Sequence, residues 1–120
     1  MANYKWFKVF DSREVAEKVV GLNQVVPVEL DNLKIALARN NKGFFAVNDA
    51  CPHQAYSLSK GFCTEEGFLV CPRHRYLFNL ENGKYQGIDC APLTIYPVEW
   101  RNNALYIGKP IGFWAKLLGL

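Results

Sequence analysis

The amino-acid sequence predicts a single all-β domain, an antiparallel sandwich or barrel, over residues 1–120. Short runs rich in β-branched and aromatic residues recur along the chain. Turn signals such as Asp31-Asn32 and Asn102-Asn103 separate them. Half of the residues are apolar and 21% are charged, which is typical of a globular protein. Many short strands between turns favour a sandwich or a barrel.

The elements follow in order from local patterns. The first strand is expected over 4–10, which is aromatic and β-branched. One short helix is expected near 12–20, because Asp11 and Glu14 resemble a capping pair and apolar residues follow at helical spacing. Residues 51–66 are rich in Pro, Gly and Ser and are expected to be irregular. The remaining strands are expected at 24–30, 33–39, 44–48, 68–70, 76–80, 93–100 and 104–107.

Composition and charge exclude several classes of protein. The net charge of +3 is too mild and too evenly spread to indicate nucleic-acid binding. We identify no export signal, and no apolar run reaches the roughly 20 residues that a transmembrane helix needs. The expected location is therefore the cytoplasm. In that reducing compartment, four cysteines favour metal ligands or free thiols over disulfides.

Two short segments carry the residues that could bind a metal. They are Cys51-Pro52-His53 and Cys71-Pro72-Arg73-His74, and they contain both histidines of the chain. One alternative is a set of unrelated buried polar residues. A second is a structural zinc module with two Cys and two His ligands. Each segment, however, supplies one thiolate and one imidazole beside a proline, and this mixed set favours a [2Fe–2S] cluster with two unlike irons.

With these segments the chain resembles the Rieske ferredoxin family. Residues that flank the two segments also agree with the family pattern: Leu58, 78–83, 91–93 and 96–98. The resemblance covers roughly 4–108. The resemblance implies an antiparallel Rieske-type β-sandwich with a small inserted cluster-binding lobe at about 46–92. It also implies one [2Fe–2S] cluster held by Cys51, His53, Cys71 and His74, covered by a segment ending in Pro92.

Two residues depart from the family pattern, since Ala55 and Arg75 stand where glycine is common. High-potential relatives also carry a disulfide between the two loops, and the matching positions here are Tyr56 and Arg73. Those relatives further direct serine and tyrosine hydroxyls at the cluster, from positions that are Tyr76 and Phe78 in this chain. Without the disulfide and the second hydroxyl, the chain resembles the low-potential type.

The remaining sequence narrows the function. Cys63 and Cys90 are left as spare thiols, and a disulfide between them is not favoured in the cytoplasm. Both histidines are used, so none is left for a mononuclear iron or as a general base. No G-x-G-x-x-G fingerprint for a nicotinamide or flavin is present. An electron carrier rather than an enzyme is expected.

Two functions within the family remain open. One is a ferredoxin that passes single electrons from a reductase to a terminal oxygenase. The other is the Rieske-like small subunit of an assimilatory nitrite reductase, which resembles this length and the Tyr96-Pro97-Val98 segment. The apolar tail 111–120 fits either a terminal turn packed on the sandwich or a segment that docks a partner or a membrane surface.

Overall fold

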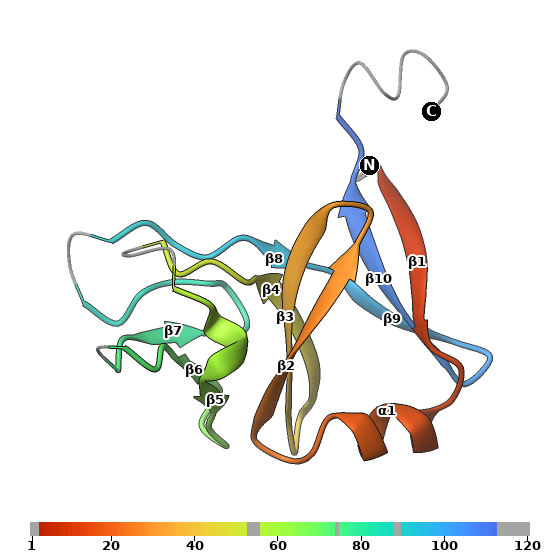
Figure 1. The fold of residues 1–120 in the computed structure, drawn as a ribbon, viewed down its shortest axis with the longest axis horizontal. Coiled ribbons are helices and arrows are strands. Elements are labelled where there is room, and N and C mark those ends of the chain that lie inside the picture. Colours follow the sequence, from red (N-terminus) through yellow and green to blue (C-terminus); the bar gives the residue numbers. More distant parts are fainter. Residues whose placement is uncertain (1–2, 53–55, 74, 88–89, 113–120) are drawn as a thin grey trace.

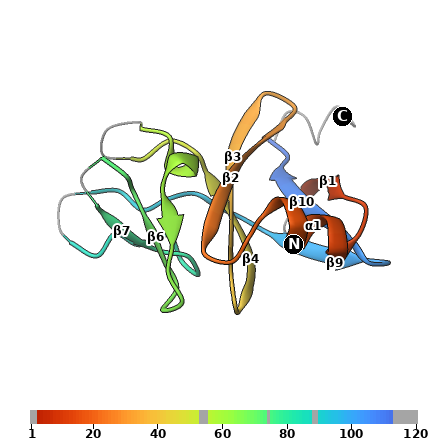
Figure 2. The ribbon, with the colours of Figure 1, turned by 60° about the horizontal axis from the view of Figure 1, so that its bottom comes forward.

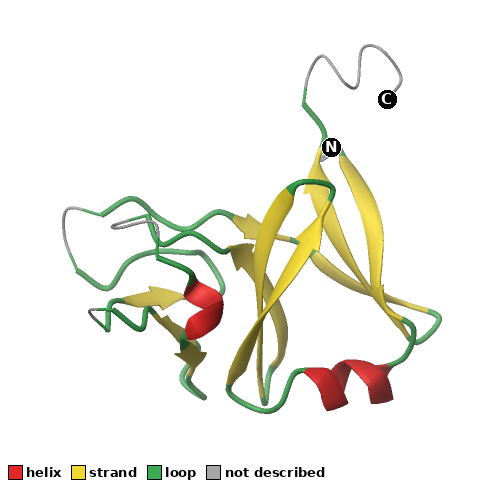
Figure 3. Cartoon of the chain, viewed as in Figure 1, coloured by secondary structure: helices red, strands yellow, loops and turns green. Residues whose placement is uncertain are grey.

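The computed structural model describes residues 3–52, 56–73, 75–87 and 90–112. They form two antiparallel β-sheets and one α-helix (Figure 1; Figure 3). The elements are β1 (Tyr4–Phe10), α1 (Arg13–Val19), β2 (Gln24–Leu30), β3 (Leu33–Asn40), β4 (Gly43–Asn48), the 3-10 turn η1 (Leu58–Lys60), β5 (Phe62–Cys63), β6 (Phe68–Val70), β7 (Leu77–Asn79), β8 (Ile95–Tyr96), β9 (Val98–Arg101) and β10 (Ala104–Pro110).

The smaller sheet has three strands in the order β1-β10-β9. The first and last strands of the chain pair along their length, with Tyr4 opposite Pro110. The turn between β9 and β10 uses Asn102 and Asn103, whose φ angles of 49° and 70° lie in the left-handed region. Asparagine tolerates this region, which two-residue hairpin turns require. The Asn-Asn turn signal is therefore confirmed.

The N-cap of helix α1 lies one residue later than the predicted cap, Asp11. Ser12 is the N-cap, with extended backbone, and its hydroxyl accepts a hydrogen bond from the backbone N–H of Val15 at 3.2 Å. The predicted capping pair of Asp11 and Glu14 is therefore wrong. Serine is as good an N-cap as aspartate, and the chain enters the helix at the residue that can reach a free N–H.

The larger sheet has seven strands in the order β7-β6-β5-β2-β3-β4-β8. Its centre is the hairpin of β2 and β3, which pair over their whole length. Asp31 and Asn32 turn this hairpin with φ angles of 47° and 69°, as the sequence predicts. Strand β5 joins β2 through one residue pair, Gln24 with Phe62. The sheet is therefore narrow at this point.

The strands β5, β6 and β7 with η1 form what we call the small lobe. Figure 1 and Figure 2 both show it on the opposite side of β2, β3 and β4 from the three-stranded sheet. The predicted irregular stretch 51–66 thus contains a short turn and a short strand.

Two apolar cores meet at strand β3. Its side chains alternate, and all four central ones are 0% exposed. Ile35 and Leu37 pack in one core, the base core, and Ala36 and Ala38 pack in the other, the lobe core. The base core contains Val20, Ile35, Leu37, Ala46, Tyr96, Leu105 and Ile107. The lobe core contains Val25, Ala36, Ala38, Val47, Cys51, Leu58, Cys63, Leu69, Cys71, Phe78, Leu80 and Leu93.

The strand predicted over 93–100 is divided at Pro97. Its first part, β8, pairs with β4 in the larger sheet, and its second part, β9, pairs with β10 in the smaller one. Proline has no N–H to give to a ladder, so it suits the crossing between the sheets.

Of the tail 111–120, the structure describes only Ile111 and Gly112, and the prediction for the rest lies outside the described residues. The N–H of Ile111 donates to the carbonyl oxygen of Asn3 at 2.9 Å. Among the described residues, no helix is long and apolar enough to cross a membrane.

Candidate metal centre

Two of the four predicted ligands lie within the small lobe. Cys51 follows β4, Cys71 follows β6, and their exposures are 1% and 2%. The structure brings both cysteines into the lobe core. His53 and His74 lie outside the described residues, as does Ala55.

The loops that begin at the two cysteines are built alike. The N–H of Cys51 donates to the carbonyl oxygen of Tyr56 at 2.9 Å, and the N–H of Cys71 donates to that of Tyr76, also at 2.9 Å. In each loop a proline follows the cysteine and the tyrosine comes five residues after it.

A pair of β-bridged residues also closes each of the two loops at equivalent positions. Ala50 pairs with Ser57 across the first loop, and Val70 pairs with Leu77 across the second. The residue before each cysteine thus faces the residue after each tyrosine. The chain closes two equivalent loops at one end of the lobe, each beginning with a buried thiol.

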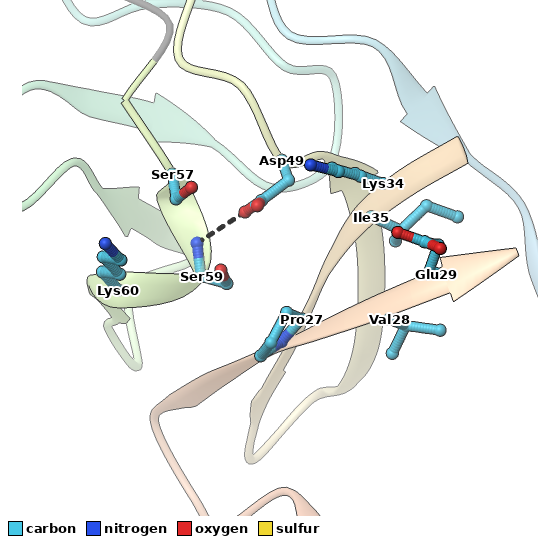
Figure 4. A pocket seen from close by; sticks show the side chains of 9 residues that line it. All are labelled: Pro27, Val28, Glu29, Lys34, Ile35, Asp49, Ser57, Ser59 and Lys60. Carbon is cyan, nitrogen blue, oxygen red and sulfur yellow. Dashed lines mark hydrogen bonds between the residues drawn. The ribbon is translucent and has the colours of Figure 1, made fainter. Parts of the chain in front are cut away.

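Asp49 anchors the first loop to the turn η1. Its carboxylate oxygen accepts a hydrogen bond from the N–H of Ser59 at 2.8 Å (Figure 4). Its carbonyl oxygen accepts one from the N–H of Leu58 at 2.7 Å. Asp49 also lines a groove of about 380 Å³ between η1 and the β2–β3 hairpin. The sequence offered no signal for this anchor beyond an Asp two residues before Cys51.

Gly61 brings η1 against the second loop. A Cβ at this position would meet the backbone carbonyl of Val70 and would lie 3.1 Å from Cδ of Pro72. Only a residue without a side chain allows this approach. The backbone of 58–61 and the loop that begins at Cys71 are therefore in direct contact.

The segment after β7 forms a further wall of the lobe. The ring of Tyr85 lies 5.3 Å from the ring of Tyr76 and 5.5 Å from that of Phe78, centroid to centroid. Burial raises the pKa of Tyr85, and the nearby Tyr76, Cys90 and Cys51 raise it further. The sequence alone gives no sign that Tyr85 belongs to this wall, because an aromatic residue after a turn does not by itself indicate a site.

A hydrogen bond between Gly83 and Leu93 joins the two ends of this segment. The N–H of Leu93 donates to the carbonyl oxygen of Gly83 at 2.8 Å. Gly83 has a φ of 78°, and a Cβ there would meet the Leu93 carbonyl. Pro92, predicted to end a covering segment, is exposed beside this closure.

Arg75 adopts a backbone conformation that explains why its position favours glycine. Its φ is 57°, in the left-handed region, and its N–H donates to the carbonyl oxygen of Cys71 at 2.9 Å. A side chain is strained there and glycine is not. The Arg75 side chain is exposed. Phe78, which replaces a hydroxyl-bearing residue, is 0% exposed.

The two spare cysteines are free thiols. Cys63 is buried in the lobe core, and its thiol donates to the carbonyl oxygen of Arg39 at 3.1 Å. Burial raises the pKa of Cys63 to about 11, although the Arg39 hydrogen bond opposes the shift. Such a thiol stays protonated and unreactive at neutral pH. Burial also raises the pKa of Cys90.

The two described cysteines fit the thiolate half of the donor set of a Rieske cluster. Such a cluster takes two thiolates and two imidazoles. Two separate but equivalent loops each present one buried cysteine, and each continues toward a histidine in the sequence. Cys63 is placed outside these loops and is held by backbone carbonyls, so it does not compete with them.

Comparisons with known proteins agree with this fit. The Rieske [2Fe-2S] domain family matches residues 5–97. The ferredoxin subunit of 3-phenylpropionate/cinnamic acid dioxygenase from Shigella boydii is 35% identical over 77 residues, which are 63% of this chain and 73% of the relative.

Solved structures share the fold. A chain in a complex of reduced oxygenase and oxidized ferredoxin of carbazole 1,9a-dioxygenase superposes with a TM-score of 0.75 at 25% identity, over 92% of this chain and 99% of that one. A putative NADH-dependent nitrite reductase small subunit from Mycobacterium tuberculosis gives 0.76 at 19% identity, over 92% and 99%. The second likeness, at that identity, shows the fold alone. On the family match and the dioxygenase ferredoxin relative, this chain belongs to the Rieske [2Fe–2S] domain family, as a protein of the Rieske ferredoxin type.

Proposed function

We propose that Cys51, His53, Cys71 and His74 hold one Rieske [2Fe–2S] cluster, and that the lobe of about 46–92 in this single domain is built to carry it. The observation that supports this assignment most strongly is the pair of matched loops. Each begins with a buried cysteine whose N–H is bonded to a tyrosine carbonyl five residues later.

The cluster, when bound, takes up and releases one electron, at a potential that its two imidazole ligands raise above that of an all-cysteine cluster. The chain's own residues keep the two thiols buried and fix the two loops against each other through Gly61 and η1. The rings of Tyr85, Tyr76 and Phe78 add apolar surface beside the loops. Burial and fixed geometry are two of the means by which proteins tune such a centre.

The protein acts as a ferredoxin that passes single electrons from a reductase to a terminal oxygenase, without catalysing a reaction itself. The dioxygenase ferredoxin relative, at 35% identity, supports this function. The nitrite reductase small subunit is the weaker alternative, because its support is a likeness of fold. The cytoplasm is the proposed location, and free Cys63 and Cys90 are consistent with a reducing compartment.

Iron and acid-labile sulfide analysis of anaerobically purified protein tests the proposal. We expect a red-brown protein with about two irons and two sulfides per chain. His53→Ala and His74→Ala should each lose or weaken the visible absorption, because ligand loss and loss of cluster are coupled. Cys63→Ala is the matched control and should keep the full iron content, since Cys63 lies outside both loops.

The opposite results would contradict the assignment. A colourless protein with one zinc would favour the structural zinc module. Full iron content in either histidine variant would mean that the ligand set is different.

A further inference from the structure

The small lobe differs in charge between its two ends, although Lys84 lies at the more acidic end and the buried carboxylate of Asp49 lies beside η1. Strands β6 and β7 run between these ends and pair antiparallel, with Phe68 opposite Asn79 and Val70 opposite Leu77. The cysteine loops leave from the end marked by Val70 and Leu77. A three-residue strand is about 10 Å long, so the two ends are separated by roughly the Debye length at physiological salt.

The loop end carries three cations, which we call the cationic rim: Lys60, Arg73 and Arg75. All three are exposed. Gly61, next to Lys60, packs against Val70 and Pro72, which places η1 at this end. Among the residues that the structure describes, none of the ion pairs involves a member of the rim.

The ring of Tyr56 makes cation–π contacts with two members of the rim. The ammonium of Lys60 lies 5.6 Å from the ring centroid, and the guanidinium carbon of Arg73 lies 6.0 Å from it. These distances are at the outer range of cation–π contacts, so each is weak. Together they hold charges from η1 and from the second loop beside the first loop, without neutralising them.

The acidic residues lie at the other end. The carboxylate of Glu65 accepts a hydrogen bond from the N–H of Asn41 at 3.2 Å, in the turn between β3 and β4. Glu66 follows it in the β5–β6 turn. Glu81 lies in the turn after β7, which is tied to the same place because the N–H of Leu80 donates to the carbonyl oxygen of Gly67.

We propose that the cationic rim, with the exposed Pro52 of the first loop and the exposed Leu77 at the end of the second, is a docking surface for an acidic face of a redox-partner protein. The proposal rests on the proposed function, which requires a partner to approach the cysteine loops. Charge complementarity identifies the partner's chemistry: carboxylates opposite the rim and an apolar centre opposite Pro52 and Leu77. Such an arrangement speeds encounter and orients the partner.

Two small oxidants of opposite charge test the sign of the surface. The reduced holoprotein is mixed in a stopped-flow instrument with ferricyanide, an anion, or with tris(phenanthroline)cobalt(III), a cation. We expect the ferricyanide rate to fall several-fold between 10 and 500 mM ionic strength, whereas the cobalt rate stays level or rises. Lys60→Glu and Arg73→Glu should each flatten or reverse the ferricyanide dependence.

Lys42→Glu is the matched control. It makes the same change in net charge in the exposed β3–β4 turn, at the acidic end, and should change the salt dependence less than Lys60→Glu or Arg73→Glu does. If a charge-reversed variant loses its colour, the neutral variant Lys60→Gln or Arg73→Gln replaces it. Each should change the salt dependence of the ferricyanide rate by about half as much as the charge reversal would, because it removes one unit of charge where the reversal changes two.

An acidic polypeptide then stands in for the partner. Polyglutamate should slow the ferricyanide reaction of the wild type by covering the rim, and should have no effect on Arg73→Glu.

The proposal is overturned if both oxidants show the same salt dependence, or if Lys42→Glu changes it as much as Arg73→Glu does. It is also overturned if polyglutamate leaves the wild-type rate unchanged. These results are distinct from a failure of the proposed function, in which no red-brown protein would be available to reduce.

Discussion

Truncation of Phe78 should destabilise the small lobe strongly and with it the cysteine loops. Phe78 is 0% exposed, its ring contacts that of Tyr85, and it lies in the same core as Cys51 and Cys71. A buried Phe removes about 150–250 Å² from water, which at about 25 cal/mol per Å² corresponds to roughly 4–6 kcal/mol. Because Ala keeps the Cβ, Phe78→Ala should lower the free energy of unfolding by about 3–5 kcal/mol.

This loss is large for a domain of this size, whose total stability is expected to be about 5–15 kcal/mol. The assay is thermal unfolding of the holoprotein, followed by far-UV circular dichroism and by the visible absorption of the cluster. We expect the midpoint of the visible transition to fall by more than about 10 °C in Phe78→Ala.

Leu105→Ala is the control from the base core, where Leu105 is also 0% exposed. A Leu→Ala change in a core costs about 2–5 kcal/mol, so the two variants are comparable in cost. In Leu105→Ala the circular dichroism midpoint should fall at least as far as the visible one. A visible midpoint in Phe78→Ala that matches the wild type would refute the placement of this ring as a support of the loops.

Three further results are expected. Between pH 9 and about 11, the Cys63 thiol should contribute a loss of at most about 2–3 kcal/mol in the free energy of unfolding, because it ionises first in the unfolded chain; Cys63→Ala should reduce the slope of stability against pH in this range, and an unchanged slope would contradict the burial of this thiol. Gly61→Ala should lower the melting temperature and the iron content, since its Cβ would meet the Val70 carbonyl; unchanged values would refute that contact. Voltammetry should give a potential near the low end of the Rieske range, roughly −150 mV, and Phe78→Tyr should raise it; a wild-type value near the top of the range would contradict the argument from the missing hydroxyl.

Turn chemistry made most of the strands predictable. Asn and Asp tolerate the left-handed backbone of two-residue turns, and the structure shows left-handed residues at both Asp31-Asn32 and Asn102-Asn103. The strands on either side then follow from their β-branched and aromatic residues. The prediction of one continuous strand over 93–100 failed because a local pattern cannot say which sheet a strand joins, and Pro97 lies between two sheets.

The candidate site was predictable as a set of residue types but not as a scaffold. Two cysteines and two histidines in mixed pairs are visible in the sequence. The support given by Tyr85 and Gly61 depends on contacts between segments that are distant along the chain, and no local pattern marks them. Arg75 was predictable in part. The sequence shows that it stands where glycine is common in the family, but it does not show that its backbone is left-handed.

The pairing of β1 with β10 has a consequence for the order of folding. Tyr4 lies opposite Pro110, so the three-stranded sheet can close only after nearly the whole chain has been synthesised. The strands of the small lobe, in contrast, pair with neighbours that follow within a few residues. Contacts that are local in sequence form sooner than distant ones. We therefore expect the strands of the lobe to pair before β1 pairs with β10, which leaves a period during folding when the cysteine loops are formed and the three-stranded sheet is still open.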